Sequence, residues 1–188
     1  MFPKIQEPRL WTLFLDRDGV INRKLPGDYV KTWDEFEFLP LVKESLARLR
    51  MFFGKMIIIS NQQGIGKGLM TENDLNIIHR KMCREIASSG GLIDKIYFCP
   101  HLADAGSFDR KPAPGMAWQA KADFSEISFD HAVMVGDAMS DMELAGNLGM
   151  IAVYIGRADD VAVNNKYRID YVFNDLNEFA DFLYETNF

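Results

Sequence analysis

Six short apolar runs, separated by longer stretches with helical periodicity, constrain the fold of this chain more than any other feature of its sequence. They cover Thr12–Leu15, Met56–Ser60, Lys95–Phe98, Ala132–Gly136, Ile151–Ile155 and Asp170–Phe173. The runs are nearly continuous in apolar residues and lack the alternation of a strand with one wet face. Because strands of this kind are covered on both faces, the pattern predicts a parallel sheet between two layers of helices.

Helical patterns fill most of the intervals between these runs. The clearest begins at Thr71, where Thr71 and Asp74 match a capping box. Leu75, Ile78 and Met82 then share one helical face. Further helices are expected at about Leu41–Met51, Gly115–Asp123, Ser140–Asn147 and Asp175–Tyr184. Strand and helix alternate throughout, so we expect an α/β fold of the three-layer, Rossmann-like class with a mostly parallel central sheet.

The composition suits one domain spanning residues 1–188. The chain is 48% hydrophobic, which is enough for one buried core, and its net charge of −6 comes without any basic block. This balance argues against nucleic acid or a membrane as partner. Two cysteines cannot form a disulfide framework, and the segment MFPKIQEPRL lacks the apolar core of a signal peptide. We therefore expect a cytoplasmic monomer.

Polar side chains follow the predicted strands at the ends where parallel sheets bind ligands. Asp16-Arg17-Asp18-Gly19 follows the first strand, and Ser60-Asn61-Gln62 follows the second. Gly136-Asp137 follows the fourth, with Asp141 one helical turn later, and Arg110-Lys111 precedes that strand. Four separate segments would thus bring carboxylates, a hydroxyl and a lysine to one rim of the sheet.

Each segment, taken singly, has an ordinary structural explanation. An Asp-Gly pair after a strand often forms a turn, and Asp137 could cap the helix that follows it. Asp141 would suit the first turn of that helix, and Lys111 could be a solvated loop charge. The run Gly64–Gly68 matches neither the dinucleotide-binding motif nor the P-loop. The function therefore depends on whether the segments act together.

Together, these residues suit phosphoryl transfer. Asp16, Asp18 and Asp137 would form an oxygen-rich site for Mg²⁺. The Asp16 carboxylate can attack phosphorus, and Asp18 can protonate the leaving group and then activate water. Ser60 and Lys111 would hold the phosphoryl oxygens.

In this order, the motifs resemble the haloacid dehalogenase (HAD) superfamily. The matching residues are Asp16-x-Asp18, Ser60, Lys111 and Gly136-Asp137-x-x-x-Asp141. The resemblance implies a HAD fold whose central strand carries Asp16, without a large cap domain. It implies that Asp16 is the nucleophile and a Mg²⁺ ligand, that Asp18 offers its backbone carbonyl to the metal, and that Asp137 completes the protein ligands. Asp141 would support these ligands from behind.

The segments LDRDGVIN, SNQQGIGKG, CPH and RKPAPGM narrow the resemblance. They are similar to the subgroup that contains heptose 1,7-bisphosphate phosphatases and histidinol-phosphate phosphatases. By this resemblance the substrate is a small phosphorylated metabolite. The heptose bisphosphate is favoured, with histidinol phosphate or a broader range of sugar phosphates as alternatives. Four residues would contact phosphate or the rest of the substrate: Asn61, Gln62, Gln63 and Arg110. The loops Arg23–Lys31, Gly64–Met70 and Cys99–Arg110 would recognise the leaving group.

Relatives of this subgroup carry a zinc loop before Arg-Lys-Pro, and here it is incomplete. Cys99 and His101 are present, but Ser107 and Asp109 stand where two further cysteines are expected. A remnant site of Cys99, His101 and Asp109 would have three donors, whereas structural zinc sites have four. We expect no zinc, and a loop that packs instead through Phe98, Leu102 and Phe108.

Two functions of other classes remain open. The incomplete zinc loop allows a non-catalytic module that binds a phosphorylated metabolite, although the catalytic positions are intact. Related domains include nucleic-acid 3′-phosphatases, but the acidic balance and the absence of a basic stripe argue against that activity.

Overall fold

The computed structural model describes residues 2–157, 159 and 166–187, and these contain one parallel sheet. The strands are β1 (Thr12–Leu15), β2 (Lys55–Asn61), β3 (Lys95–Cys99), β4 (Ala132–Gly136), β5 (Ile151–Ile155) and β6 (Tyr171–Phe173). Their order in the sheet is β3-β2-β1-β4-β5-β6, and every neighbouring pair is parallel. All six predicted strands are confirmed to within one residue at each end.

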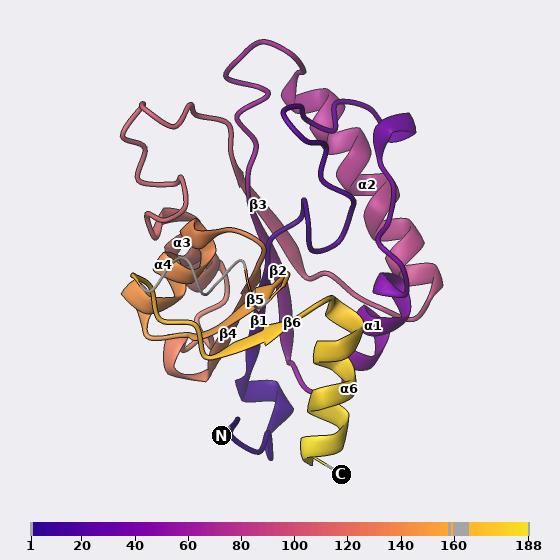
Figure 1. Cartoon of the computed structure of the whole chain (residues 1–188), viewed down its shortest axis with the longest axis vertical. Coiled ribbons are helices and arrows are strands. Elements are labelled where there is room, and N and C mark those ends of the chain that lie inside the picture. The colour runs from indigo at the N-terminus through magenta and orange to yellow at the C-terminus, as the bar shows by residue number, and fades with distance from the viewer. Residues whose placement is uncertain (1, 158, 160–165, 188) are drawn as a thin grey trace.

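Helices cover both faces of the sheet, as Figure 1 shows. They are α1 (Val42–Leu49), α2 (Glu72–Ser88), α3 (Gly115–Asp123), α4 (Met139–Leu148) and α6 (Leu176–Asn187), with short 3₁₀ turns η1 (Pro8–Leu10), η2 (Trp33–Glu35) and η3 (Phe129–His131). The predicted capping box begins α2: the Asp74 N–H donates to Thr71 Oγ1 at 3.2 Å, and the Thr71 N–H donates to Asp74 Oδ2 at 2.9 Å. The α/β fold with helices on both faces is confirmed.

Strand β1 contributes to the core on both sides. Leu13 and Leu15 pack in the apolar cluster beneath α1, α2 and α6, and Phe14 packs in the cluster beneath α3 and α4. All three side chains are fully buried. Burying a large apolar side chain contributes roughly 1.5–3 kcal/mol, so this strand is anchored firmly from both faces. Residues directly after it therefore have a well-defined position.

The central place of β1 brings the expected site residues together. In the sheet register, Leu15 pairs with Ile58 of β2 on one side and with Val135 of β4 on the other. The residues that follow these three strands thus meet at one rim. In the described part of the chain, the connections 16–41 and 100–114 add only the turn η2 and isolated bridges, and neither forms a cap domain.

None of the helices that the structure describes is long and apolar enough to cross a membrane.

Candidate active site

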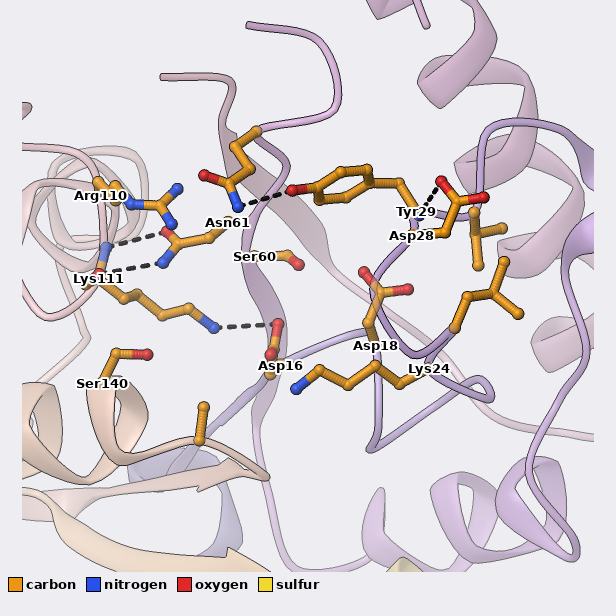
Figure 2. Close-up of a pocket in the computed structure, with 14 residues that line it drawn as sticks. Asp16, Asp18, Lys24, Asp28, Tyr29, Ser60, Asn61, Arg110, Lys111 and Ser140 are labelled. Atoms are coloured by element: carbon orange, nitrogen blue, oxygen red, sulfur yellow. Dashed lines mark hydrogen bonds and ion pairs between the residues drawn. The ribbon is translucent and has the colours of Figure 1, made fainter. Parts of the chain in front are cut away.

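A pocket of about 270 Å³ lies at the carboxyl ends of β1 and β2. Figure 2 shows Arg110 and Lys111 on one wall, Lys24 and Tyr29 on the opposite wall, and Asp16 and Ser60 between them. The lining residues are Asp16, Asp18, Lys24, Leu25, Asp28, Tyr29, Val30, Ser60, Asn61, Gln63, Arg110, Lys111, Ala138 and Ser140. The pocket therefore joins the four segments that the sequence analysis singled out.

Three carboxylates converge next to the pocket, and Asp16 is the one of them that lines it. Asp16, Asp137 and Asp141 each offer an oxygen, and these oxygens lie within 4.8 Å of one another. Two glycines make the approach possible. A Cβ on Gly136 would overlap the Asp141 side chain, and a Cβ on Gly19, whose φ is 89°, would overlap the Asp137 carboxylate. The glycines after the first strand and within the Gly-Asp motif thus have a steric role in assembling the cluster.

Lys111 is the buried cation of the cluster. Its Nζ lies 3.0 Å from Asp16 Oδ1 and 2.7 Å from Asp141 Oδ1, and it donates to the Ile59 carbonyl at 2.8 Å. Burial opposes the charged form, but the two carboxylates outweigh it and raise the pKa of Lys111. The ammonium is therefore charged, and its three N–H groups have three acceptors: Asp16, Asp141 and the Ile59 carbonyl.

The donor set fits a hard divalent cation. Asp137 Oδ2 accepts from Lys24 Nζ at 2.7 Å, whereas its buried Oδ1 has no hydrogen-bond partner among the described residues. Burial, reinforced by Asp16, raises the pKa of Asp137. Burial also raises the pKa of Asp141 to about 7, against the lowering effect of Lys111. Clustered carboxylate oxygens that are costly to ionise suit Mg²⁺, which prefers oxygen ligands.

The Asp18 side chain lies outside this carboxylate cluster. Its two oxygens accept from Arg17 Nη2 at 2.8 Å each, and further bonds come from Asn22 Nδ2 at 2.9 Å and Gln62 Nε2 at 2.8 Å. Burial alone would raise its pKa, but Arg17 and the other donors lower the pKa of Asp18. Any contribution of Asp18 to a metal would therefore come from its backbone carbonyl, as the resemblance implies.

The structure separates the predicted substrate-binding residues into two groups. Ser60, Gln63 and Arg110 line the pocket. Asn61 also lines the pocket. Its Nδ2 donates to the Lys111 carbonyl and its Oδ1 accepts from the Lys111 N–H, each at 3.0 Å, so the Asn61 side chain holds the loop that carries Lys111. Gln62 is only 1% exposed and donates to Asp18 and Ser60. Gln62 is not among the residues that line the pocket, and its contact with substrate stays a prediction.

The predicted recognition loops are likewise only partly at the pocket. Arg23–Lys31 supplies five lining residues, and Cys99–Arg110 supplies Arg110. None of the lining residues comes from Gly64–Met70. Gln63, directly before this loop, lines the pocket and donates to Tyr29 Oη at 2.7 Å.

The proposed zinc remnant does not converge in the described residues. Cys99 Sγ lies 3.7 Å from His101 Nδ1, and that nitrogen lies 2.7 Å from Ser107 Oγ. The Asp109 carboxylate instead accepts from Gln119 Nε2 at 2.8 Å. The only convergent group of three metal-ligating side chains in the described ranges is the aspartate cluster.

Apolar packing of this loop differs from the expectation. Phe98 packs against the core, and Leu102 is half-buried beside Gly66. Phe108 is 62% exposed, so the prediction that the loop packs through Phe108 is wrong.

Several site residues had no clear signal in the sequence. Lys24 and Tyr29 come from the predicted recognition loop Arg23–Lys31, but that loop has no periodicity to indicate which of its side chains line the pocket. Arg17 lies inside the first motif and would ordinarily be solvated, yet it is fully buried against His79. Burial and the Arg17 guanidinium lower the pKa of His79 to about 3. In the sequence, the only indication of the Arg17–His79 contact is that His79 lies beside the apolar face of α2.

Comparisons with known proteins agree with this geometry. A model of the HAD-hydrolase-like family matches residues 108–179. The chain is 42% identical over 177 residues to the D-glycero-alpha-D-manno-heptose-1,7-bisphosphate 7-phosphatase of Mycobacterium tuberculosis, covering 90% of each chain. It is 37% identical over 137 residues to the D-glycero-beta-D-manno-heptose-1,7-bisphosphate 7-phosphatase of Bordetella bronchiseptica, covering 73% of this chain and 75% of the relative.

Solved structures give the same result. The D,D-heptose 1,7-bisphosphate phosphatase of B. bronchiseptica, solved with magnesium and phosphate, matches with a TM-score of 0.85 and 31% identity over 94% of this chain and 99% of that one. The corresponding enzyme of Burkholderia thailandensis matches with a TM-score of 0.67 and 30% identity, over 92% and 98% of the two chains. This chain therefore belongs to the haloacid dehalogenase superfamily of phosphatases, in the same subgroup as these heptose-bisphosphate phosphatases.

Proposed function

We propose that this protein is a Mg²⁺-dependent phosphatase that removes the 7-phosphate of D-glycero-D-manno-heptose 1,7-bisphosphate through an aspartyl-phosphate. The observation that carries the proposal is the convergence of Asp16, Asp137 and Asp141 within 4.8 Å, with Lys111 Nζ 3.0 Å from Asp16. Asp16 and Lys111 both line the pocket. A nucleophile, a metal site and a phosphate-binding cation are thus next to one another.

The chain's own residues account for both chemical steps. A carboxylate oxygen of Asp16 forms a bond to phosphorus while the bond to the sugar oxygen breaks. The leaving alkoxide takes up a proton from Asp18, which enters this step in its protonated form although, against the raising effect of burial, Arg17 lowers its pKa. Asp18 then accepts a proton from water, whose oxygen displaces Asp16 and releases phosphate. Ser60 and Lys111 hold the phosphoryl oxygens throughout.

Asp16 and Asp137 would hold the metal, with the backbone carbonyl of Asp18. When bound, Mg²⁺ supplies positive charge that offsets the carboxylates and the phosphoryl oxygens.

The identity of the sugar is supported by the relatives and by the pocket. Those at 42% identity are named for the alpha anomer, whereas the B. bronchiseptica relative at 37% is named for the beta anomer. We therefore expect the alpha anomer to be preferred. Lys24 and Arg110 line opposite walls of the pocket and would attract the second phosphate.

Phosphate release by the purified protein tests the proposal. The panel contains both anomers of the heptose bisphosphate, histidinol phosphate, simple sugar phosphates and a 3′-phosphorylated oligonucleotide, each with Mg²⁺ and with EDTA. We expect one anomer to exceed the other substrates by about a hundredfold in kcat/KM, or about 2.7 kcal/mol. Asp16→Asn should abolish turnover and leave the circular dichroism spectrum unchanged.

Other outcomes would reject parts of the proposal. Preference for histidinol phosphate or the oligonucleotide would support the phosphatase activity but reject the heptose bisphosphate as its substrate. Full activity of Asp16→Asn would exclude the aspartyl-phosphate. Substrate binding without any phosphate release would favour the non-catalytic module, which the incomplete zinc loop first suggested.

A further inference from the structure

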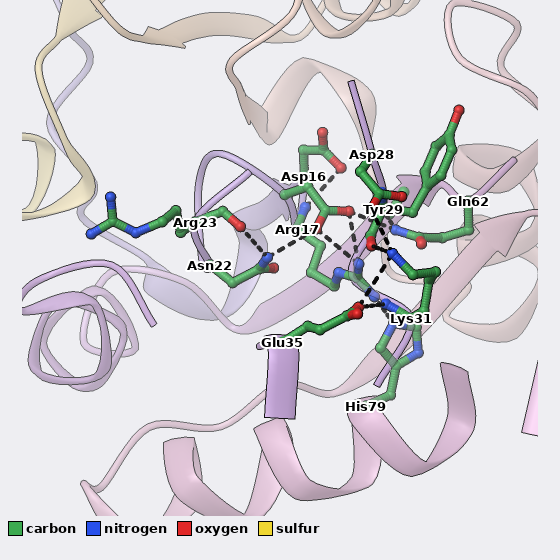
Figure 3. A network of polar contacts seen from close by, with 12 residues as sticks. Asp16, Arg17, Asn22, Arg23, Asp28, Tyr29, Lys31, Glu35, Gln62 and His79 are labelled. Atoms are coloured by element: carbon green, nitrogen blue, oxygen red, sulfur yellow. Dashed lines mark hydrogen bonds and ion pairs between the residues drawn. The ribbon is translucent and has the colours of Figure 1, made fainter. Parts of the chain in front are cut away.

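A fully buried arginine lies behind the proposed acid/base residue. The Arg17 side chain is 0% exposed, and its Nη2 donates to both Asp18 oxygens at 2.8 Å. Its Nη1 lies 3.3 Å from His79 Nε2. In Figure 3 the Arg17 side chain lies at the centre, with Asn22 to its left, Gln62 to its right and His79 below it. Burying a guanidinium is costly unless the charge is paired, and Asp18 supplies that pairing here.

His79 connects this arginine to a rigid helix. It lies on α2, next to Ile78 and Met82, which are fully buried in the core. The imidazole is itself 6% exposed and, with its lowered pKa, neutral, so Nε2 accepts from the guanidinium. The orientation of Arg17 is thus set by a helix that is well anchored in the fold.

The opposite side of Asp18 is connected to the phosphoryl site. Asn22 Nδ2 donates to Asp18 Oδ1 at 2.9 Å, and Gln62 Nε2 donates to Asp18 Oδ2 at 2.8 Å. The same Gln62 nitrogen lies 3.0 Å from Ser60 Oγ, the hydroxyl expected to bind the phosphoryl group. Each Asp18 oxygen therefore has two donors, and the Gln62 side chain links the Asp18 carboxylate to the Ser60 hydroxyl.

We propose that Arg17 and His79 are positioning residues for Asp18: His79 orients the guanidinium, and Arg17 holds the carboxylate where it can reach the leaving-group oxygen. This inference rests on the proposed phosphatase function. Arg17 Nη2 contacts both Asp18 oxygens, and Asn22 and Gln62 add one donor to each, so together these donors fix the position and the plane of the carboxylate. Small displacements of a catalytic group cost large factors in rate, so loss of this support should impair proton transfer specifically.

The leaving group provides the test. The alkoxide of a sugar phosphate needs a proton as it departs, whereas 4-nitrophenolate is a stable anion and needs little help. We expect His79→Leu to lower kcat/KM for the heptose bisphosphate about 10- to 100-fold more than for 4-nitrophenyl phosphate. The KM for the sugar should change little, because the phosphate contacts remain. Equal losses for the two substrates would show a purely structural role and overturn the inference.

Matched variants separate positioning from stability. In His79→Gln an amide oxygen can still accept from Arg17, so this variant should retain most of the sugar activity. Arg17→Lys keeps the charge but lacks a second nitrogen to meet His79 while the first holds Asp18, so it should share the leaving-group defect of His79→Leu. His131→Leu is the control, because His131 is exposed and is not among the residues that line the pocket. Failure of glutamine to restore activity would contradict the role given to His79.

A crystal structure of His79→Leu keeps this inference separate from the proposed function. We expect the Asp18 carboxylate to leave the position seen here. An unmoved carboxylate would overturn the positioning role whatever the activity. If the wild-type protein releases no phosphate from either substrate, the proposed function fails on its own, while a displaced Asp18 would still show that Arg17 and His79 hold it.

Discussion

Replacing His79 with glutamine should make the free energy of unfolding depend less on pH between pH 8 and pH 5. The folded protein keeps this buried imidazole neutral down to about pH 3, whereas in the unfolded chain it takes up a proton near its ordinary pKa of 6.5. Between these values the unfolded state binds more protons than the folded state. Stability from this group is therefore fully present above pH 6.5 and is lost as the pH falls towards 3.

The size of the effect follows from the interval between the pH and the unfolded pKa. At pH 5 the solution is about 1.5 units below 6.5, and each unit corresponds to about 1.36 kcal/mol. Protonation of His79 in the unfolded chain should thus cost about 2 kcal/mol of the free energy of unfolding between pH 8 and pH 5. Glutamine does not titrate. Between pH 8 and pH 5, the free energy of unfolding of His79→Gln should therefore fall by about 2 kcal/mol less than that of the wild type.

Urea unfolding, followed by far-ultraviolet circular dichroism in EDTA at pH 8, 6.5 and 5, measures this difference. The carboxylates titrate in both proteins, so their contribution largely cancels when the two pH profiles are subtracted. His131→Gln is the matched control, because that histidine is exposed. Parallel pH profiles for the wild type and His79→Gln would refute the assignment of a neutral, buried His79.

Other parts of the structure lead to further predictions. Mg²⁺ at a hundredfold its Kd should raise the free energy of unfolding by about 2.7 kcal/mol, and Asp137→Asn should lose most of that gain in the same titration. Lys111→Met leaves Asp16 and Asp141 without their buried cation and should cost about 3–5 kcal/mol in denaturant unfolding, with partial recovery in Mg²⁺. Lys24→Met should raise the KM for the bisphosphate more than for a monophosphate in steady-state assays. Thr71→Ala removes the cap of α2 and should cost about 1 kcal/mol, seen as a lower Tm in calorimetry.

Local sequence patterns predicted the elements of this fold because burial and periodicity are properties of short segments. The apolar run Thr12–Leu15 is buried on both faces, and the capping box at Thr71 begins a helix where expected. The ordered motifs also indicated that Asp16, Ser60 and Asp137 meet, since carboxyl ends of neighbouring parallel strands share one rim.

Side-chain direction in loops could not be predicted in the same way. Gln62 and Gln63 are adjacent, yet Gln62 turns inward to Asp18 and Gln63 reaches the pocket. Asp109 turns to Gln119 and away from Cys99 and His101. A non-periodic segment has no repeat that assigns a face, so only its tertiary contacts decide where each side chain points.

The sequence by itself determined the α/β architecture, the order of the motifs and the chemistry that Asp16, Asp18 and Lys111 can perform. Only the tertiary structure decided that Lys111 pairs with both Asp16 and Asp141, and that Arg17 is buried between His79 and Asp18. The physical reason is that residue type and periodicity act locally. The partner of a buried charge is chosen by packing between segments far apart in the chain, as Arg17 and His79 are.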